Sequence, residues 1–382
     1  MPRLFPKNKY SSFNQRESLN NLICNKSILD SFHYLNCYKN EIEKIPFSVV
    51  NKEIMNKIEL CSKSIISKDY LEYAEFVKKP FNYNDSPWVS ILGTGSMNPT
   101  TYRNVSSVLI GISQSTMALF DCGEGTLYQL VEQFGDDYVE VLNKIQLIMI
   151  THIHGDHFYG IINLIERRRK LCKSANPLFV CLPQNCLQIP MALFKHSELT
   201  DYNIILVTNQ DLVNNFYPND KYLKATIKEN YDPDGSLNYR NPEIEKTLTE
   251  YKAMFPNNID LIIKFFELNN IKNIIPVPVY HCPESVGFVF DFNNKRIVYS
   301  GDCKMTVKLS EYGHEADMLI HEATFDCSHN VLDVVRKGHS NIEHALSIAL
   351  KMNARFTCLS HFSQRYNITP ESSILEDIFI SP

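Results

Sequence analysis

One cluster of metal-binding side chains constrains the fold of this chain more than any other feature of its sequence. The apolar run 146–150 predicts a short buried strand, and His152, His154, Asp156 and His157 follow it closely. Because residues i and i+2 of an extended chain point the same way, His152 and His154 can converge on one ion. After a turn, Asp156 and His157 would face a neighbouring ion. Imidazole nitrogens and a carboxylate oxygen suit zinc and related divalent ions, so the motif predicts a metal site at a strand end.

Three further residues that can bind metal also stand at the ends of apolar runs. His281 follows the run 276–280, Asp302 follows the run 295–300 and its glycine, and His361 follows the run 356–360. A single histidine in a protein core is more often hydrogen-bonded than metal-bound, so none of the three is decisive alone. Together with the first motif they provide three ligands for each of two ions and one carboxylate that can bridge them, with room for a bridging water.

The composition is that of a large globular protein. The chain has 382 residues, of which 44% are hydrophobic and 21% charged, and this excludes wholesale disorder. No apolar run approaches the roughly 18 residues of a membrane span, so no membrane association is expected. Eleven cysteines without a CxxC pair are typical of a reducing compartment. The net charge of −5 gives no electrostatic indication of a nucleic-acid partner.

The character of the sequence changes near Asp85. Residues 1–85 are rich in Lys, Asn, Glu and Ser, and glycine is absent from the first 92 residues. Strand-like runs then begin at 89–92, 108–112 and 117–120, and helical patterns follow at 158–171 and 341–352, the second with an Asn341 N-cap candidate. We therefore predict an N-terminal extension over 1–85 and one layered α/β domain over 86–382. Residues 172–278 are rich in Asn, Asp and Pro and indicate an insertion in that domain.

The seven candidate metal ligands resemble those of the metallo-β-lactamase superfamily. This resemblance implies an α/β fold in which four layers form an αββα sandwich around a binuclear zinc site. It also implies that His152, His154 and His281 hold one zinc ion, while Asp302 bridges to a second. The second ion would be held by Asp156, His157 and His361. The same nitrogen and oxygen ligands would also accept Mn²⁺ or Co²⁺.

Six other segments, in sequence order, resemble the motifs of one family on this fold, tRNase Z. They are GTGSMNPTTYRNVSS at 93–107, FDCGEGT at 120–126, HCPESVG at 281–287, SGDC at 300–303, HEATF at 321–325 and KGHS at 337–340. The resemblance covers roughly residues 88–366. It implies a zinc-dependent endoribonuclease that removes the 3′ trailer from precursor tRNA. Such an enzyme cuts the phosphodiester after the discriminator nucleotide and leaves a 3′ hydroxyl for CCA addition.

The same resemblance assigns two proton-transfer roles. Asp156 would accept a proton from the attacking water and orient it. His339 would donate a proton to the leaving 3′ oxygen and would itself be oriented by Glu322, as a carboxylate-held imidazole. Asp121 is expected to make a hydrogen bond that fixes the tautomer of a ligand histidine.

Three residues are expected to contact the substrate. Arg103 and Asn104 lie in the loop that, in this family, approaches the acceptor end of the tRNA. Ser340 follows the proposed proton donor in the KGHS segment. All three contacts are implied by the resemblance alone.

One part of the family pattern is missing. Short tRNase Z enzymes carry a protruding arm with a GP-containing motif that grips the tRNA, and residues 172–278 contain no such motif. The catalytic body instead resembles the C-terminal half of a long-form enzyme, with residues 1–85 as a remnant of the N-terminal half or a linker. We therefore expect precursor tRNA as the substrate and an arm-bearing N-terminal half, or a dimer partner, as a second partner.

Other functions and several locations stay open on the sequence alone. The same fold hosts glyoxalase-II-like thioesterases and other nucleic-acid nucleases, although the HEATF and KGHS segments argue against a thioesterase. A non-catalytic RNA-binding relative would be expected to lack some of the seven ligands. Nucleus or cytoplasm is the expected location, and four basic residues without an acid in the first sixteen residues leave the mitochondrion open.

Overall fold

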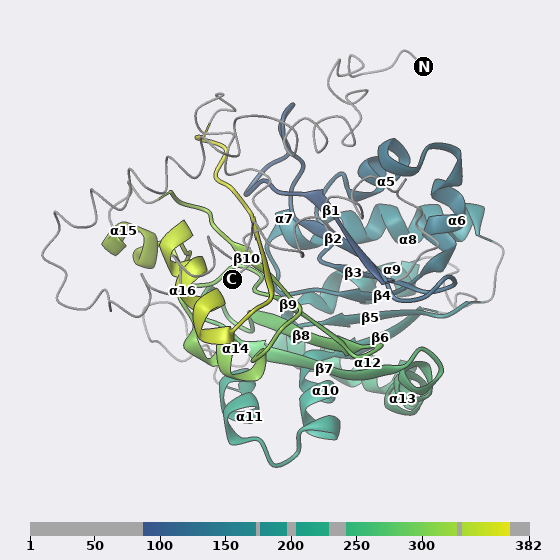
Figure 1. The fold of residues 1–382 in the computed structure, drawn as a ribbon. Helices are drawn as coiled ribbons and strands as arrows, with labels where there is room; N and C mark the ends of the chain where they lie inside the picture. The colour runs from purple at the N-terminus through teal and green to yellow at the C-terminus, as the bar shows by residue number, and fades with distance from the viewer. Residues whose placement is uncertain (1–86, 173–175, 197–203, 229–241, 327–330, 367–382) are drawn as a thin grey trace, which may run out of the picture. The chain divides into compact units, whose positions relative to one another are not determined.

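The computed structural model describes residues 87–172, 176–196, 204–228, 242–326 and 331–366 (Figure 1). They all belong to the larger of two compact units, Tyr83–Ile380. The prediction for residues 1–85 lies outside the described residues. In the described part, no helix is both long enough and apolar enough to cross a membrane.

Two mixed β-sheets form the centre of the described unit. The first runs in sequence order: β1 (Trp88–Gly93), β2 (Ser107–Gly111), β3 (Met117–Phe120), β4 (Ile145–Met149), β5 (Leu178–Leu182) and β6 (Ile204–Thr208). The second has the order β11 (Phe356–Ser360), β10 (Met318–Glu322), β9 (Lys295–Tyr299), β8 (Val286–Phe292) and β7 (Ile271–Pro278). In each sheet the first three strands along the chain pair antiparallel and the later pairs are parallel.

Alternating side chains on the strands build separate cores on the two faces of each sheet. On β2, Val108 and Ile110 belong to the core between the sheets, whereas Leu109 belongs to the core on the outer face. On β8, Phe290 lies in the inner core and Val289 in the outer core of the second sheet. Both faces of both sheets are therefore buried, which requires helices on the two outer faces.

Two groups of helices cover those outer faces (Figure 1). The first sheet is covered by α5 (Thr126–Phe134), α6 (Tyr138–Lys144), α8 (Gly160–Leu171), α9 (Gln188–His196) and α12 (Pro242–Met254). The second is covered by α10 (Asn209–Phe216), α11 (Lys221–Lys228), α14 (Val307–Tyr312) and α16 (Ile342–Met352), and α13 (Asn258–Leu268) packs on the inner core. The predicted α/β class with four αββα layers is confirmed.

The local predictions differ in their success. The strand-like runs and the two helical patterns named from the sequence all match described elements to within two residues, and the Asn341 side chain accepts a hydrogen bond from the His344 N–H as an N-cap. The expected insertion over 172–278 needs correction. This segment supplies β5 and β6 of the first sheet and β7 of the second, so most of its described residues are part of the sandwich.

An ion pair within the second sheet leads to a prediction about stability. Asp291 on β8 lies opposite Arg296 on β9, and each carboxylate oxygen lies 2.8 Å from a guanidinium nitrogen. Burial alone would raise the pKa of Asp291, but the hydrogen bonds from Arg296 and Asn273 outweigh it and lower that pKa. The carboxylate therefore stabilises the fold above the ordinary Asp pKa, and this contribution is lost as the pH falls through the lower, folded-state value.

We expect Asp291→Asn to lower the free energy of unfolding by about 2 kcal/mol at pH 7, because the Arg296 guanidinium loses its charged partner. Urea unfolding at pH 7 and at pH 3 measures this, and the difference from wild type should shrink at the lower pH. Asp136→Asn, at an exposed acid, is the matched control. Equal stability of wild type and Asp291→Asn at pH 7 would contradict the prediction.

Candidate metal centre and catalytic site

The candidate site lies where several strands of the two sheets end. The loop after β4 carries His152 and His154 and leads into the short helix α7 (Gly155–Phe158) with Asp156 and His157. His281 follows β7, Asp302 follows β9, Glu322 ends β10 and His361 follows β11. Because β7, β9, β10 and β11 run in one direction, their C-terminal ends meet at one edge of the second sheet. All seven residues predicted as ligands converge there.

The first group of donor atoms gathers around one oxygen of Asp302. Nδ1 of His154 lies 3.1 Å from Nε2 of His152 and 3.1 Å from Nε2 of His281. Asp302 Oδ2 lies 3.7 Å from Nε2 of His152 and 3.6 Å from Nε2 of His281. Three imidazoles and one carboxylate oxygen thus surround a common point.

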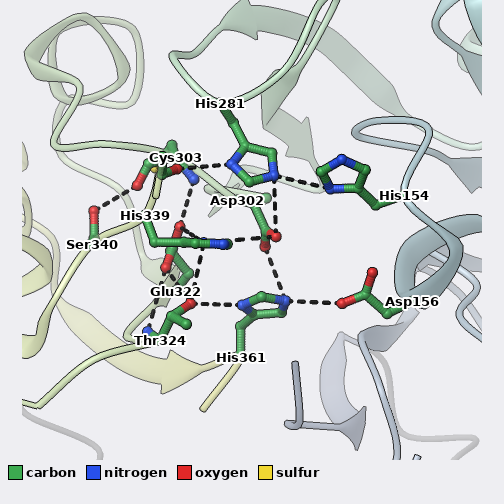
Figure 2. A network of polar contacts seen from close by, with 12 residues as sticks. His154, Asp156, His281, Asp302, Cys303, Glu322, Thr324, His339, Ser340 and His361 are labelled. Atoms are coloured by element: carbon green, nitrogen blue, oxygen red, sulfur yellow. Dashed lines mark hydrogen bonds and ion pairs between the residues drawn. The ribbon is translucent and has the colours of Figure 1, made fainter. Parts of the chain in front are cut away.

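A second group gathers around the other oxygen of the same carboxylate. Nε2 of His157 lies 3.2 Å from Nε2 of His361, and Asp302 Oδ1 lies 3.2 and 3.3 Å from these two nitrogens. Asp156 Oδ2 lies 3.3 Å from His361 Nε2 and 3.7 Å from His157 Nε2. The Asp302 carboxylate joins this group to the first one (Figure 2).

These distances match the requirements of a divalent metal. Four ligands at zinc–nitrogen or zinc–oxygen bond lengths in tetrahedral geometry are separated by ~3.3 Å, close to the values in both groups. Asp302 Oδ1 is buried, and no described group gives it a well-aligned hydrogen bond. A buried carboxylate oxygen without such a donor is costly unless a cation lies beside it. The donor set therefore fits two ions that share Asp302.

The ring nitrogens that face away from these groups have their own partners. Thr324 Oγ1 lies 2.8 Å from His361 Nδ1, and the backbone carbonyl of Gly338 lies 2.8 Å from His281 Nδ1. Thr151 Oγ1 lies 2.9 Å from His152 Nδ1. Such contacts fix the orientation of a ligand imidazole. The sequence reasoning identified none of these three partners. For Thr324 and Gly338 the reason is that each contact joins segments far apart in the chain.

Asp121 is buried beside His157 and has several hydrogen-bond donors around it. Its Oδ2 lies 2.7 Å from His157 Nδ1 and 2.9 Å from the Tyr299 hydroxyl, which donates to it. The backbone N–H of Thr151 donates to Asp121 Oδ1 at 2.8 Å. The contact expected from the sequence is thus made to His157, and Tyr299 is a further partner that the sequence did not indicate.

The charges at the site favour ionised carboxylates. Burial alone would raise the pKa of Asp302 and of Asp156, but neighbouring imidazoles lower both below the ordinary value. Burial alone would lower the pKa of His157, and Asp302 and Asp121 raise it well above the ordinary value instead. Burial lowers the pKa of His152. The site therefore presents two carboxylates that remain negative at neutral pH, as cation binding requires.

His339 and Glu322 form a pair at the rim of this centre (Figure 2). His339 Nδ1 lies 3.0 Å from Glu322 Oε1, and the other carboxylate oxygen accepts a hydrogen bond from the Thr324 hydroxyl at 2.5 Å. The Cys303 N–H donates to Glu322 Oε1 at 2.6 Å and fixes it further. Burial alone would lower the pKa of His339, but the Glu322 carboxylate raises it to about 9. His339 therefore carries a proton at neutral pH.

The three predicted substrate contacts lie in different surroundings. Arg103 is half-buried, and its guanidinium donates to the backbone carbonyl of Tyr366 and lies over the Phe362 ring. Asn104 is half-buried, and its amide lies so close to Gly125 that a Cβ there would meet its Oδ1 at 2.6 Å. Both side chains are therefore partly exposed to solvent.

Ser340 requires a correction. Its side chain is fully buried, and its hydroxyl donates to the carbonyl of Cys303 at 2.7 Å. A buried, bonded hydroxyl cannot contact an RNA chain. Ser340 instead joins the segment that carries His339 to the turn after β9.

Backbone contacts hold the helix α7 and the start of α8 against the loop at 121–125. The Gly160 N–H donates to the Cys122 carbonyl at 2.9 Å, and a Cβ on Gly160 would lie 2.0 Å from the Gly123 carbonyl oxygen. A Cβ on Gly123 would lie 2.2 Å from the carbonyl oxygen of Asp156. Glycine is required at both positions for this close approach, which positions the metal-binding segment.

Comparisons with known proteins agree with this geometry. Residues 257–362 match a family model described as the beta-lactamase superfamily domain, and residues 88–186 match one described as the anti-Pycsar protein Apyc1. The zinc phosphodiesterase ELAC protein 2 homolog of Caenorhabditis elegans is 30% identical over 84% of this chain and 37% of its own length. The mitochondrial tRNase Z TRZ3 of Arabidopsis thaliana is 28% identical over 84% of this chain and 36% of its own length.

A solved structure is similar in fold. The crystal structure of a long form RNase Z from yeast aligns with a TM-score of 0.60 and 22% identity over 80% of this chain and 43% of that chain. The chain thus spans little more than a third of the length of the two curated relatives named above. Together, the sandwich, the seven converging residues and these matches show that the chain has the metallo-β-lactamase fold and is similar to part of longer proteins named tRNase Z and zinc phosphodiesterase ELAC protein 2.

Proposed function

We propose that this chain is a zinc-dependent endoribonuclease that removes the 3′ trailer from precursor tRNA by hydrolysis after the discriminator nucleotide. One observation carries the proposal: two groups of metal-binding side chains share the Asp302 carboxylate, and a proton-carrying histidine stands beside them. That arrangement suits phosphodiester hydrolysis, which needs an activated water and a protonated leaving oxygen. The substrate, precursor tRNA, is inferred from the relatives that are named tRNase Z.

The residues that would hold zinc are the two groups described above. His152, His154 and His281 would bind one ion, and Asp302 would bridge to the other. Asp156, His157 and His361 would complete the second site. Zinc bound there supplies Lewis-acid stabilisation of charge on the phosphodiester and lowers the pKa of water. Manganese or cobalt would fit the same nitrogen and oxygen donors.

The protein's own groups then divide the proton transfers between them. Asp156 is ionised and partly open to solvent, so its carboxylate can accept a proton from the attacking water. His339 is protonated and half-buried, so it can donate a proton to the leaving 3′ oxygen. Glu322 holds His339 in place through the 3.0 Å contact and keeps it charged. Arg103 and Asn104 would contact the acceptor end of the tRNA.

The curated relatives are longer than the part that this chain matches, and this bears on the partners that the chain needs. The chain contains the complete set of candidate catalytic residues but matches only part of the longer proteins. We propose that an arm-bearing N-terminal half, or a dimer partner, contributes to the grip on the tRNA. We also propose a domain over 86–382 preceded by an extension over 1–85, and a location in the nucleus, the cytoplasm or the mitochondrion.

Cleavage of a 3′-extended precursor tRNA by the full chain loaded with zinc tests the proposed function. The expected products are a tRNA that ends in a 3′ hydroxyl at the discriminator nucleotide and a trailer with a 5′ phosphate, and end mapping identifies both. A chelated sample is the control. An arm-bearing chain, added in a second series, should increase the rate. Hydrolysis of a glutathione thioester without cleavage of the RNA would overturn the proposal in favour of the thioesterase alternative.

A further inference from the structure

A cavity of about 170 Å³ adjoins the metal centre through Asp156, and its other lining residues are not candidate metal ligands. It is lined by Met97, Asn98, Pro99, Val105, Glu124, Gly155, Asp156 and Tyr159. None of these residues is basic, and two are acidic. Such a lining disfavours a phosphate group and suits a neutral group that can accept contact with an aromatic ring.

Tyr159 gives the cavity a fixed aromatic wall. A Cβ on Gly155 would lie 2.8 Å from two carbons of the Tyr159 ring, so the ring rests against the glycine backbone, while the residue is 55% exposed. Asp156 and Tyr159 are three residues apart in helical backbone and therefore lie on the same face of that turn. One side of the ring is supported by the protein, and an exposed part of it lies beside the proposed proton acceptor.

Met97 also lines the cavity, and its backbone is held in place. The backbone N–H of Met97 donates to Asp156 Oδ2 at 2.7 Å, while its side chain is 75% exposed. The Gln364 amide donates to the carbonyl of Asn98 at 2.9 Å. The thioether of a methionine packs well on flat aromatic groups. Met97 and Tyr159, which both line the cavity, therefore offer surfaces suited to contact with a planar group.

We propose that this cavity binds the nucleobase on one side of the scissile phosphate, with the base stacked on the Tyr159 ring. The inference rests on the proposed function, because it assumes an RNA substrate. A nucleobase is neutral and planar, and stacking on an aromatic ring does not depend on which base is present. Its position beside Asp156 would align the neighbouring phosphodiester with the attacking water.

The test combines changes in the enzyme with changes in the substrate. Wild type and Tyr159→Ala are each given intact precursor tRNA, precursor tRNA with an abasic discriminator nucleotide, and precursor tRNA with an abasic first trailer nucleotide. Loss of one stacked base should lower kcat/KM of the wild type about tenfold for one of the two abasic substrates. Tyr159→Ala should lower kcat/KM about tenfold on the intact RNA and cause little further loss on that abasic RNA.

Three controls keep the result specific. Tyr159→Phe preserves the ring and should retain most of the activity. Tyr128→Ala removes an aromatic residue with a similar exposure, 54%, that does not line the cavity, and its effect should be the same on all three RNAs. Zinc content and thermal unfolding of Tyr159→Ala should equal those of wild type, which separates a stacking effect from loss of metal or fold.

Two results would overturn the inference. In the first, the fold-loss in kcat/KM caused by Tyr159→Ala multiplies the fold-loss caused by each of the two abasic nucleotides, as for independent effects. In the second, Tyr159→Ala cleaves intact RNA with the same kcat/KM as wild type. Failure of the wild type to cleave intact precursor tRNA would instead overturn the proposed function, and this inference with it.

Discussion

Replacement of Asp156 by alanine is expected to slow cleavage of precursor tRNA by about four orders of magnitude. The carboxylate has two roles in the proposed mechanism, and alanine removes both. It would accept the proton of the attacking water, and its Oδ2 stands 3.3 Å from His361 Nε2 in the second group of metal-binding atoms. Single-turnover cleavage at saturating enzyme measures the rate, so that weaker RNA binding does not obscure the chemical step.

Metal analysis of the same variant separates its two roles. Loss of one ligand should reduce bound zinc from about two ions per chain toward one, because the remaining ligands of the second group are two imidazoles and Asp302. Asp333→Ala provides the control, since Asp333 is exposed on α15 (Val331–Arg336) and pairs with Arg336 of the same helix. Cleavage by Asp156→Ala at the wild-type rate would contradict the proposed mechanism.

The sequence was sufficient to predict that the seven candidate metal ligands converge because their signal is local. Each of the seven residues follows, within a few positions, a run of buried residues, and strand ends in a layered α/β fold collect at one edge. The spacing of His152 and His154 on extended chain needs no knowledge of the rest of the molecule. The resemblance to a known family then paired residues that are more than 200 positions apart, such as His157 and His361.

The sequence reasoning did not predict the strands β5 and β6, and the reason is physical. Every residue of β5 and of β6 is buried, and a short continuous apolar run cannot be distinguished from a buried helix segment by periodicity alone. Both also lie in a segment rich in Asn, Asp and Pro, which indicated loops. Their place in the sheet depends on the pairing of β5 with β4 and of β6 with β5, contacts that no single short segment of the chain contains.

The error at Ser340 shows the limit of reasoning from a motif. A serine beside a candidate catalytic histidine is expected to contact substrate, but the direction of its side chain depends on the fold around it. Ser340 points to the Cys303 carbonyl and is fully buried. The same holds for Thr324 and Tyr299, whose hydroxyls support His361 and Asp121 and whose roles appear only when the two sheets are packed together.

The second large effect is expected at His339. We expect His339→Ala to slow cleavage of precursor tRNA by about a thousandfold, because the leaving 3′ oxygen loses its proton donor. Glu322→Gln keeps the size of the side chain but removes the charge beside His339 Nδ1, so a smaller loss is expected. The seven candidate metal ligands are unchanged in both variants, and zinc content should equal that of wild type.

A substrate with sulfur in place of the leaving 3′ oxygen tests whether proton donation is the role of His339. A thiol has a pKa of about 8.5, far below that of an alcohol, so sulfur departs as a thiolate and needs no proton. The defect of His339→Ala should therefore largely disappear on this RNA, whereas Asp156→Ala, which acts on the attacking water, should remain defective. If His339→Ala were equally slow on both RNAs, His339 would act through RNA binding or through the arrangement of the centre. Glu322, whose Oε1 lies 3.0 Å from His339 Nδ1, would then only hold His339 in position, and would not serve to keep a general acid protonated.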